Sequence, residues 1–165
     1  FELYFPAEPE LRLPKKRTTP TPESGAGHVL IVDDEVLVLN ATKRVLLAAG
    51  YTVTTASSGP EAVKLYVDDP KRFDIVLLDM IMPNMGGAEV FDALIAADPS
   101  VSVVLVSGYS IGEQANDVLK RGALGFLQKP FDAALLTEKI NKALRHRMSR
   151  PRTRRYTDVA PSLTE

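Results

Sequence analysis

The sequence predicts an open, doubly wound α/β domain, in which helices cover both faces of a parallel sheet. Two observations predict this class. From His28 onward, apolar runs of strand length alternate with segments of helical period, and several of these runs are apolar on both faces. Parallel strands that are covered by helices on both sides require such runs. Strict alternation of strand and helix then favours right-handed crossovers between parallel strands.

Five strands are predicted, each bounded by polar or turn residues. The second predicted strand, residues 51–56, contains several polar residues, whereas the first, third and fourth predicted strands are apolar on both faces. The predicted strands span residues 29–33, 51–56, 74–79, 101–107 and 125–129.

Sequence signals also predict where the helices between the strands begin and end. Gly50 ends the first helix, and the Ser-Gly-Pro run 58–60 begins the second. Ser110, followed by Glu113 three residues later, matches a capping box at the start of the fourth helix. The last helix is predicted to begin at Asp132.

Composition limits the chain to one ordinary domain with flanking segments. It has 165 residues, of which 45% are hydrophobic and 25% charged, as in average globular domains. The absence of cysteine excludes disulfides, thiolate nucleophiles and cysteine-bound zinc. The net charge of −1 gives no overall attraction to nucleic acid or to a membrane. No apolar segment approaches the roughly 18 residues of a membrane span.

The segments on either side of the predicted domain differ from it in composition. The chain begins with Phe1, so we expect it to be part of a longer protein. Residues 1–6 alternate as a strand does, and residues 7–27 are rich in Pro, Thr, Lys and Glu, which predicts a linker. Residues 28–147 form the domain. The polar, arginine-rich residues 148–165 are too few for an output domain, and a disordered tail is preferred over a phosphate-binding one.

Polar side chains stand at the end of four predicted strands. Asp33 and Asp34 end the first, Asp79 ends the third, Ser107 ends the fourth and Lys129 ends the fifth. Ligands of open α/β sheets bind at the carboxyl ends of the strands. Any one of these residues alone is better explained as a helix cap or a solvated turn residue, but four matching strand ends predict a site.

The three aspartates require a positive partner. Two unit charges about 4 Å apart repel by about 4 kcal/mol at an effective dielectric constant near 20. Carboxylate oxygens suit a hard cation such as Mg²⁺, and the absence of nearby His and Cys argues against softer metals. With a lysine and a hydroxyl beside them, these groups can support phosphoryl transfer, with Asp79 as the nucleophile.

In this order and spacing, the motifs VDDE, DMIMPNMGG, SGYS and KPF resemble the response regulator receiver family over about residues 28–146. The resemblance implies a flavodoxin-like, three-layer (βα)5 sandwich with strand order 2-1-3-4-5. It also implies Mg²⁺ as the cofactor. Asp34 would bind the ion directly and Asp33 through water, with Asp79 and the backbone carbonyl of Ile81 completing the protein ligands.

The same resemblance implies how the remaining site residues act. Asp79 would accept a phosphoryl group from phosphohistidine, and Lys129 would pair with a phosphoryl oxygen. The peptide bond between Lys129 and Pro130 would be cis. Ser107 would swing its hydroxyl toward another phosphoryl oxygen, and Phe126 would then turn inward as an aromatic switch. Tyr109 and Ile81 lie where the family sets its self-dephosphorylation rate. Neither carries a carboxylate or amide that orients water, so we expect slow self-dephosphorylation.

Several features indicate which kind of receiver this is. SGYS and GALGFLQKPF are most similar to receivers at the C-terminal end of hybrid sensor histidine kinases, and residues 1–6 resemble the last strand of a kinase ATP-binding domain, although an unrelated origin of these six residues stays open. The expected partner is a kinase dimerisation and phosphotransfer domain or a histidine-containing phosphotransfer protein. We expect a cytoplasmic location, a parent kinase that can be membrane-anchored, and no nucleic-acid or membrane contact by this part.

Three alternatives remain open from the sequence. A stand-alone receiver that acts by protein contact would use the same site. A Mg²⁺-dependent aspartyl-phosphate phosphohydrolase would also use an aspartate on an α/β sheet, but such enzymes carry a DxD pattern after the first strand, and VDDE lacks that spacing. A nucleotide-binding domain is disfavoured because no glycine-rich phosphate loop follows the first strand.

Overall fold

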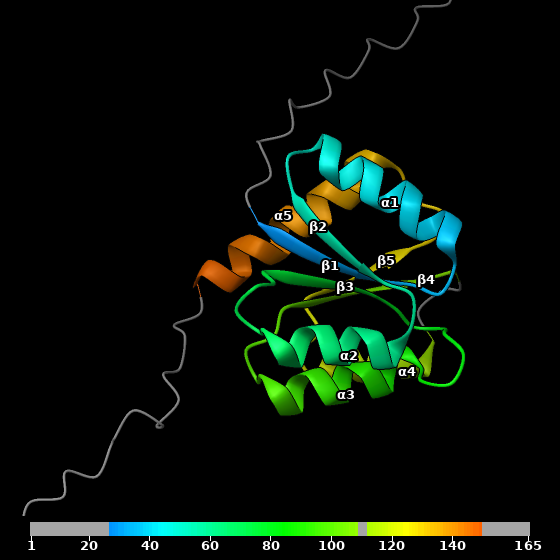
Figure 1. Ribbon diagram of the computed structural model, residues 1–165, viewed down its shortest axis with the longest axis vertical. Helices are drawn as coiled ribbons and strands as arrows, with labels where there is room; N and C mark the ends of the chain where they lie inside the picture. The colour runs from blue at the N-terminus through cyan, green and yellow to red at the C-terminus, as the bar shows by residue number, and fades with distance from the viewer. Residues whose placement is uncertain (1–26, 109–111, 150–165) are drawn as a thin grey trace, which may run out of the picture.

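The computed structural model describes residues 27–108 and 112–149, which form a three-layer α/β sandwich (Figure 1). All strand pairs are parallel, and the strand order is β2-β1-β3-β4-β5. Both the predicted flavodoxin-like class and the predicted strand order are therefore confirmed. The elements are β1 (His28–Val32), α1 (Val36–Ala48), β2 (Thr52–Ala56), α2 (Gly59–Asp68), β3 (Ile75–Asp79), α3 (Gly87–Ala97), β4 (Val103–Ser107), α4 (Glu113–Lys120), β5 (Gly125–Gln128) and α5 (Ala133–Ser149).

The sheet separates two hydrophobic cores. Helices α1 and α5 cover one face, and α2, α3 and α4 cover the other. Within β1, Val29 and Ile31 pack toward α1 and α5, whereas Leu30 and Val32 pack toward α2 and α3. Because successive side chains of a strand point to opposite faces, a strand with a helix layer on each side must be apolar throughout.

Three predicted helix termini follow their sequence signals. Ser58 is the N-cap of α2, and Gly50, at φ 91°, follows the C-cap of α1. At the start of α5, the Asp132 carboxylate accepts a hydrogen bond of 2.7 Å from the backbone N–H of Leu135. This bond satisfies one of the free amides of the first turn.

The predicted capping box at the start of α4 is wrong. Helix α4 begins at Glu113, and its N-cap is Gly112, which has an extended backbone (φ −82°, ψ 175°). Glu113 is thus the first helical residue, whereas a capping box needs an acidic residue at the third. Ser110 itself lies outside the described residues.

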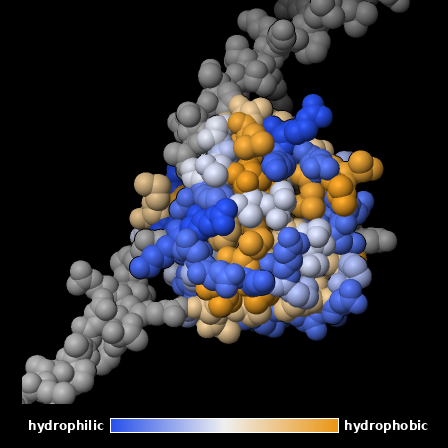
Figure 2. Space-filling model, in the orientation of Figure 1, coloured by the Kyte–Doolittle hydropathy of each residue, from blue (hydrophilic) through white to orange (hydrophobic). Residues whose placement is uncertain are grey.

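Several other predictions concern residues that the structure does not describe. These are the strand over residues 1–6, most of the linker over 7–27, Tyr109, and the tail beyond Ser149. Helix α5 runs to Ser149, two residues past the predicted end of the domain. Among the described residues, none of the helices is long and apolar enough to span a membrane. On the face in Figure 2, hydrophilic and hydrophobic side chains are interspersed.

Candidate functional site

Strand register brings the predicted aspartates together. Val32 of β1 is opposite Leu78 of β3, so Asp33 follows β1 beside Asp79 at the end of β3. One carboxylate oxygen from each of Asp33, Asp34 and Asp79 lies within 4.8 Å of the others. Asp33 and Asp79 are 2% and 4% exposed, whereas Asp34 is half-buried. The site is therefore a largely buried acidic cluster.

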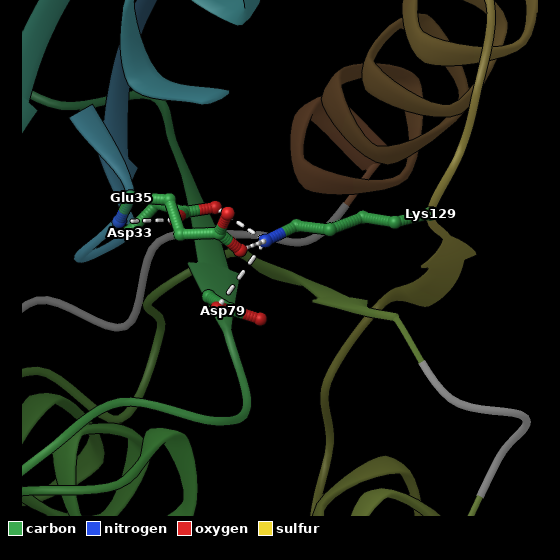
Figure 3. A network of polar contacts seen from close by, with 4 residues as sticks. All are labelled: Asp33, Glu35, Asp79 and Lys129. Carbon is green, nitrogen blue, oxygen red and sulfur yellow. Dashed lines mark hydrogen bonds and ion pairs between the residues drawn. The ribbon is translucent and has the colours of Figure 1, made fainter. Parts of the chain in front are cut away.

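Lys129 enters this cluster from the end of β5. Its Nζ lies 2.7 Å from Asp33 Oδ2 and 3.3 Å from Asp79 Oδ2. Glu35 Oε1 is 3.8 Å from the same ammonium. In Figure 3, Lys129 approaches from one side and Asp33 and Glu35 from the other, with Asp79 between them at the end of β3. Lys129 thus connects the end of β5 to the ends of β1 and β3 through ion pairs.

Burial and charge shift the pKa values of Asp79 and Lys129. Burial raises the pKa of Asp79, and the nearby Asp33 charge adds to the increase; Lys129 and the Ile81 backbone N–H oppose it without cancelling it. Burial alone would lower the pKa of Lys129, but the hydrogen bond to Asp33 and the charge of Asp79 outweigh it and raise the pKa. The lysine therefore stays charged, and the Asp79 carboxylate lacks full charge compensation.

The donor chemistry of the cluster fits Mg²⁺. It offers carboxylate oxygens from Asp33, Asp34 and Asp79, which are hard ligands, and a single nearby ammonium does not balance three negative charges. A divalent cation bound by these oxygens would remove the remaining repulsion. The carboxylate of Asp79, which lies beside two other aspartates and a lysine, is equipped to act as a nucleophile toward phosphorus.

Two of the predicted switch residues, Ser107 and Phe126, lie in the neighbouring strands β4 and β5. Ser107 ends β4 and is 5% exposed, and the bond between Lys129 and Pro130 is cis. Phe126 of β5 is partly buried against the core beneath α2, α3 and α4. The Ile81 side chain, in contrast, is 56% exposed at the mouth of the site.

Two residues of the site were not assigned from the sequence. Glu35 donates its backbone N–H to Asp33 Oδ1 at 2.9 Å while its side chain approaches Lys129. Gly87 begins α3 directly against the end of β3, where a Cβ atom would lie 2.4 Å from the Asp79 carbonyl oxygen. The available signals were the third acidic residue of VDDE and the glycine at position 87, where two backbones approach closely.

Comparison with known proteins identifies the family. The model of the response regulator receiver domain matches residues 29–141. Chemotaxis protein CheY of Listeria monocytogenes is 37% identical over 116 residues, or 70% of this chain and 96% of CheY. Sensor kinase CckA of Brucella abortus is 35% identical over 130 residues, or 79% of this chain but only 14% of the kinase. Transcriptional regulatory protein ZraR of Salmonella typhimurium is 36% identical, and the chain spans 27% of its length.

Solved structures agree with this assignment. A response regulator receiver domain protein from Clostridium thermocellum superposes with a TM-score of 0.71 at 29% identity, covering 74% of this chain and 98% of that one. The CheX–CheY complex of Borrelia burgdorferi, with beryllofluoride and Mg²⁺, matches with a TM-score of 0.66 at 31% identity, covering 69% of this chain and 86% of that one. The chain therefore belongs to the response regulator receiver domain family, the phosphoacceptor domains of two-component systems.

Proposed function

We propose that Asp79 accepts a phosphoryl group from a phosphohistidine in a reaction that requires Mg²⁺. The observation that carries this proposal is the placement of the Asp79 carboxylate, which is 4% exposed, lies in the aspartate cluster and is 3.3 Å from the Lys129 ammonium. An oxygen of Asp79 attacks phosphorus, and the phosphorus–nitrogen bond of the donor breaks. The electron pair of that bond returns to the imidazole, and Asp79 becomes an acyl phosphate.

The other site residues then stabilise the transferred group. Asp33, Asp34, Asp79 and the Ile81 carbonyl would hold Mg²⁺, which would supply positive charge next to the phosphoryl oxygens. Lys129 shifts its contact from the Asp79 carboxylate to a phosphoryl oxygen, and the Ser107 hydroxyl donates to another. Positioning and charge neutralisation of this kind supply most of the catalysis in phosphoryl transfer.

Phosphorylation also drives the switch. The acyl phosphate adds roughly −1.5 to −2 charge at Asp79. As Ser107 turns toward it, Phe126 moves further into the space beneath α4 and changes the surface of α4, β5 and α5. Phe126 is already partly buried against the adjoining core, which supports this inward movement.

The proposed partner docks beside α1. Val36, Leu37 and Ile81 are 62%, 84% and 56% exposed, and they flank the acidic cluster. Exposed apolar side chains next to a reactive group suit a helical protein that presents its phosphohistidine there. A kinase dimerisation domain or a histidine-containing phosphotransfer protein fits this description.

We place the receiver within a hybrid sensor histidine kinase in the cytoplasm, downstream of a kinase ATP-binding domain and a linker. The 35% identity with the receiver-containing part of sensor kinase CckA supports this placement. A stand-alone receiver is the second candidate, because CheY matches over 96% of its own length. A longer reading frame that encodes kinase motifs before residue 1 would decide in favour of the hybrid kinase.

The proposed site can be tested with beryllofluoride, which mimics a phosphoryl group on an aspartate. Amide NMR spectra of the wild type should shift around Ser107, Phe126 and Lys129 when beryllofluoride and Mg²⁺ are added together. Asp79→Asn should not respond, because a neutral amide replaces the carboxylate that binds beryllium. Unchanged wild-type spectra would contradict the proposed site. A phosphoryl half-life of seconds on the isolated domain would contradict the expected slow self-dephosphorylation.

A further inference from the structure

Glu35 lies at the mouth of the acidic site and reaches its lysine. Its backbone N–H binds Asp33 Oδ1 at 2.9 Å, and its Oε1 is 3.8 Å from Lys129 Nζ. Lys129 binds the other oxygen of Asp33, Oδ2, at 2.7 Å. Figure 3 shows the Glu35 side chain directed toward the lysine from the β1 side. Glu35 therefore contacts both the buried carboxylate and the side chain that must later bind the phosphoryl group.

The Glu35 carboxylate also faces solvent, unlike the aspartate beneath it. Its side chain is 65% exposed, whereas that of Asp33 is 3% exposed. Glu35 is the N-cap residue of α1, but its side chain makes no capping hydrogen bond. A neutral side chain of the same size at this position should therefore leave the helix intact.

Charge at this position acts on the phosphodonor before it reaches Asp79. The donor is an anion, and Glu35 adds a negative charge to a site that already holds three aspartates and one lysine. An exposed negative charge repels an approaching anion over roughly 10 Å at 0.1 M salt. The neighbouring Val36, Leu37 and Ile81 are apolar and exposed. A partner that docks on them would also cover Glu35 and remove the solvent from its charge, which is costly unless the partner supplies a cation.

We infer that Glu35 is a specificity-determining residue, a charge filter that disfavours small dianionic phosphodonors and favours donors with a cation beside the phosphoryl group. The inference rests on the proposed function of Asp79. A phosphohistidine protein with a basic side chain next to its histidine would neutralise Glu35 on docking. Acetyl phosphate offers no such cation, so Glu35 protects the site from being phosphorylated without its partner.

Two small donors of different charge test the filter. Acetyl phosphate is close to a dianion at neutral pH, and its reaction breaks the phosphorus–oxygen bond and releases acetate. Phosphoramidate carries a protonated nitrogen on phosphorus, which gives it a lower net charge and an adjacent cation, and it releases ammonia. Initial rates of adduct formation on Asp79 would be measured by intact mass for both donors at saturating Mg²⁺.

The variants separate charge from structure. Glu35→Gln should raise the ratio of the acetyl phosphate rate to the phosphoramidate rate by about threefold at low salt, and Glu35→Lys should raise it further. The increase should shrink toward 1 M salt, where charges are screened within about 3 Å. Glu35→Asp should keep the wild-type ratio. Glu138→Gln, which removes an exposed charge from α5, serves as the matched control.

Each outcome has a defined meaning. An unchanged donor ratio in both Glu35→Gln and Glu35→Lys, with a phosphorylated wild type, would overturn the charge filter while leaving the function of Asp79 intact. Equal slowing with both donors, independent of salt, would show that Glu35 acts only through the structure of the site and would also overturn the inference. Absence of any adduct on the wild type would instead contradict the proposed function itself.

Discussion

Two adjacent glycines at the start of α3 differ in the space around them. A Cβ atom on Gly87 would lie 2.4 Å from the Asp79 carbonyl oxygen and 2.7 Å from Met80 Cα, both backbone atoms. On Gly86 the nearest neighbour would be the Met80 carbonyl oxygen at 3.8 Å, an ordinary contact. Gly87 therefore lets α3 begin directly against the strand that carries Asp79.

This difference predicts that alanine destabilises the domain at Gly87 but hardly at Gly86. Gly87→Ala should lower the free energy of unfolding by about 1–3 kcal/mol, because β3 and α3 must move apart. Gly86→Ala, at φ −71°, should change it by less than about 0.5 kcal/mol. Urea denaturation of both variants measures the difference, and equal stabilities would show that the close approach is not needed.

His28 lies at the opposite end of the sheet from the site. Its Nε2 is 2.8 Å from Thr54 Oγ1, and its backbone N–H donates to Asp74 Oδ2 at 2.8 Å. Burial lowers the pKa of His28 below 6.5, and the charge of Arg72 lowers it further, against the opposing effect of Asp74. The native state thus binds the proton of His28 less readily than the unfolded state does.

The sign of the pH effect follows from this difference. Above pH 6.5 both states are neutral at His28, and as the pH falls through 6.5 toward the lower native pKa, the unfolded state is protonated first. Stability is therefore lost over that window. His28→Gln should gain melting temperature relative to the wild type as the pH falls from 8 to about 5. A difference in melting temperature between His28→Gln and the wild type that stays constant from pH 8 to about 5 would contradict the prediction.

Helix α5 connects the site to the opposite end of the molecule. It begins just after the turn that carries Lys129, and its last turns carry Arg147, which pairs with Asp74 just before β3. Its first turn is capped by Asp132, and its buried residues Leu136 and Ile140 pack under β3 and β4. The cap therefore fixes where the chain leaves the site and enters the helix.

Loss of this cap should weaken the domain. Asp132→Ala should lower the free energy of unfolding by about 1 kcal/mol, because the Leu135 N–H loses its acceptor. Asp132→Asn keeps a capping oxygen and should retain most of the stability. Thermal unfolding in the presence of a chelator separates this effect from cation binding, and equal losses in both variants would argue against the capping role.

The sequence predicted some elements well because a single local signal determined each of them. Strands β1, β3 and β4 are buried on both faces, so their apolar runs located them within two residues at either end. The start of α4 was wrong, because the spacing of Ser110 and Glu113 matches a capping box but the backbone places Gly112 at the N-cap. Such a choice depends on how the preceding loop leaves β4, which local spacing does not encode.

At the scale of the whole molecule, strand order determines the site. Asp33, Asp79 and Lys129 are far apart in sequence, yet parallel strands in the order β2-β1-β3-β4-β5 end at one edge. Polar residues at strand ends were therefore sufficient to predict the acidic cluster. The approach of Glu35 to Lys129 was not predictable, because the direction of an exposed side chain depends on the packing of α1 and β5.

The clustered aspartates also make the stability of the domain depend on a cation. Without Mg²⁺, Asp33, Asp34 and Asp79 repel one another, so Asp34→Asn should raise the melting temperature in a chelator by about 2–5 °C. It should also abolish the stabilisation that Mg²⁺ gives the wild type. Differential scanning calorimetry with and without Mg²⁺ measures both effects. A variant that melts earlier yet still responds to Mg²⁺ would contradict the cluster as a cation site.

The most direct test of the account is the intact mass of the chain after incubation with acetyl phosphate. With Mg²⁺, the wild type should gain a single phosphoryl group, and omission of Mg²⁺ should prevent the gain. Asp79→Asn should gain none, because its amide cannot attack phosphorus. An adduct that persists in Asp79→Asn, or that forms equally well in a chelator, would contradict Asp79 as the Mg²⁺-dependent phosphoacceptor.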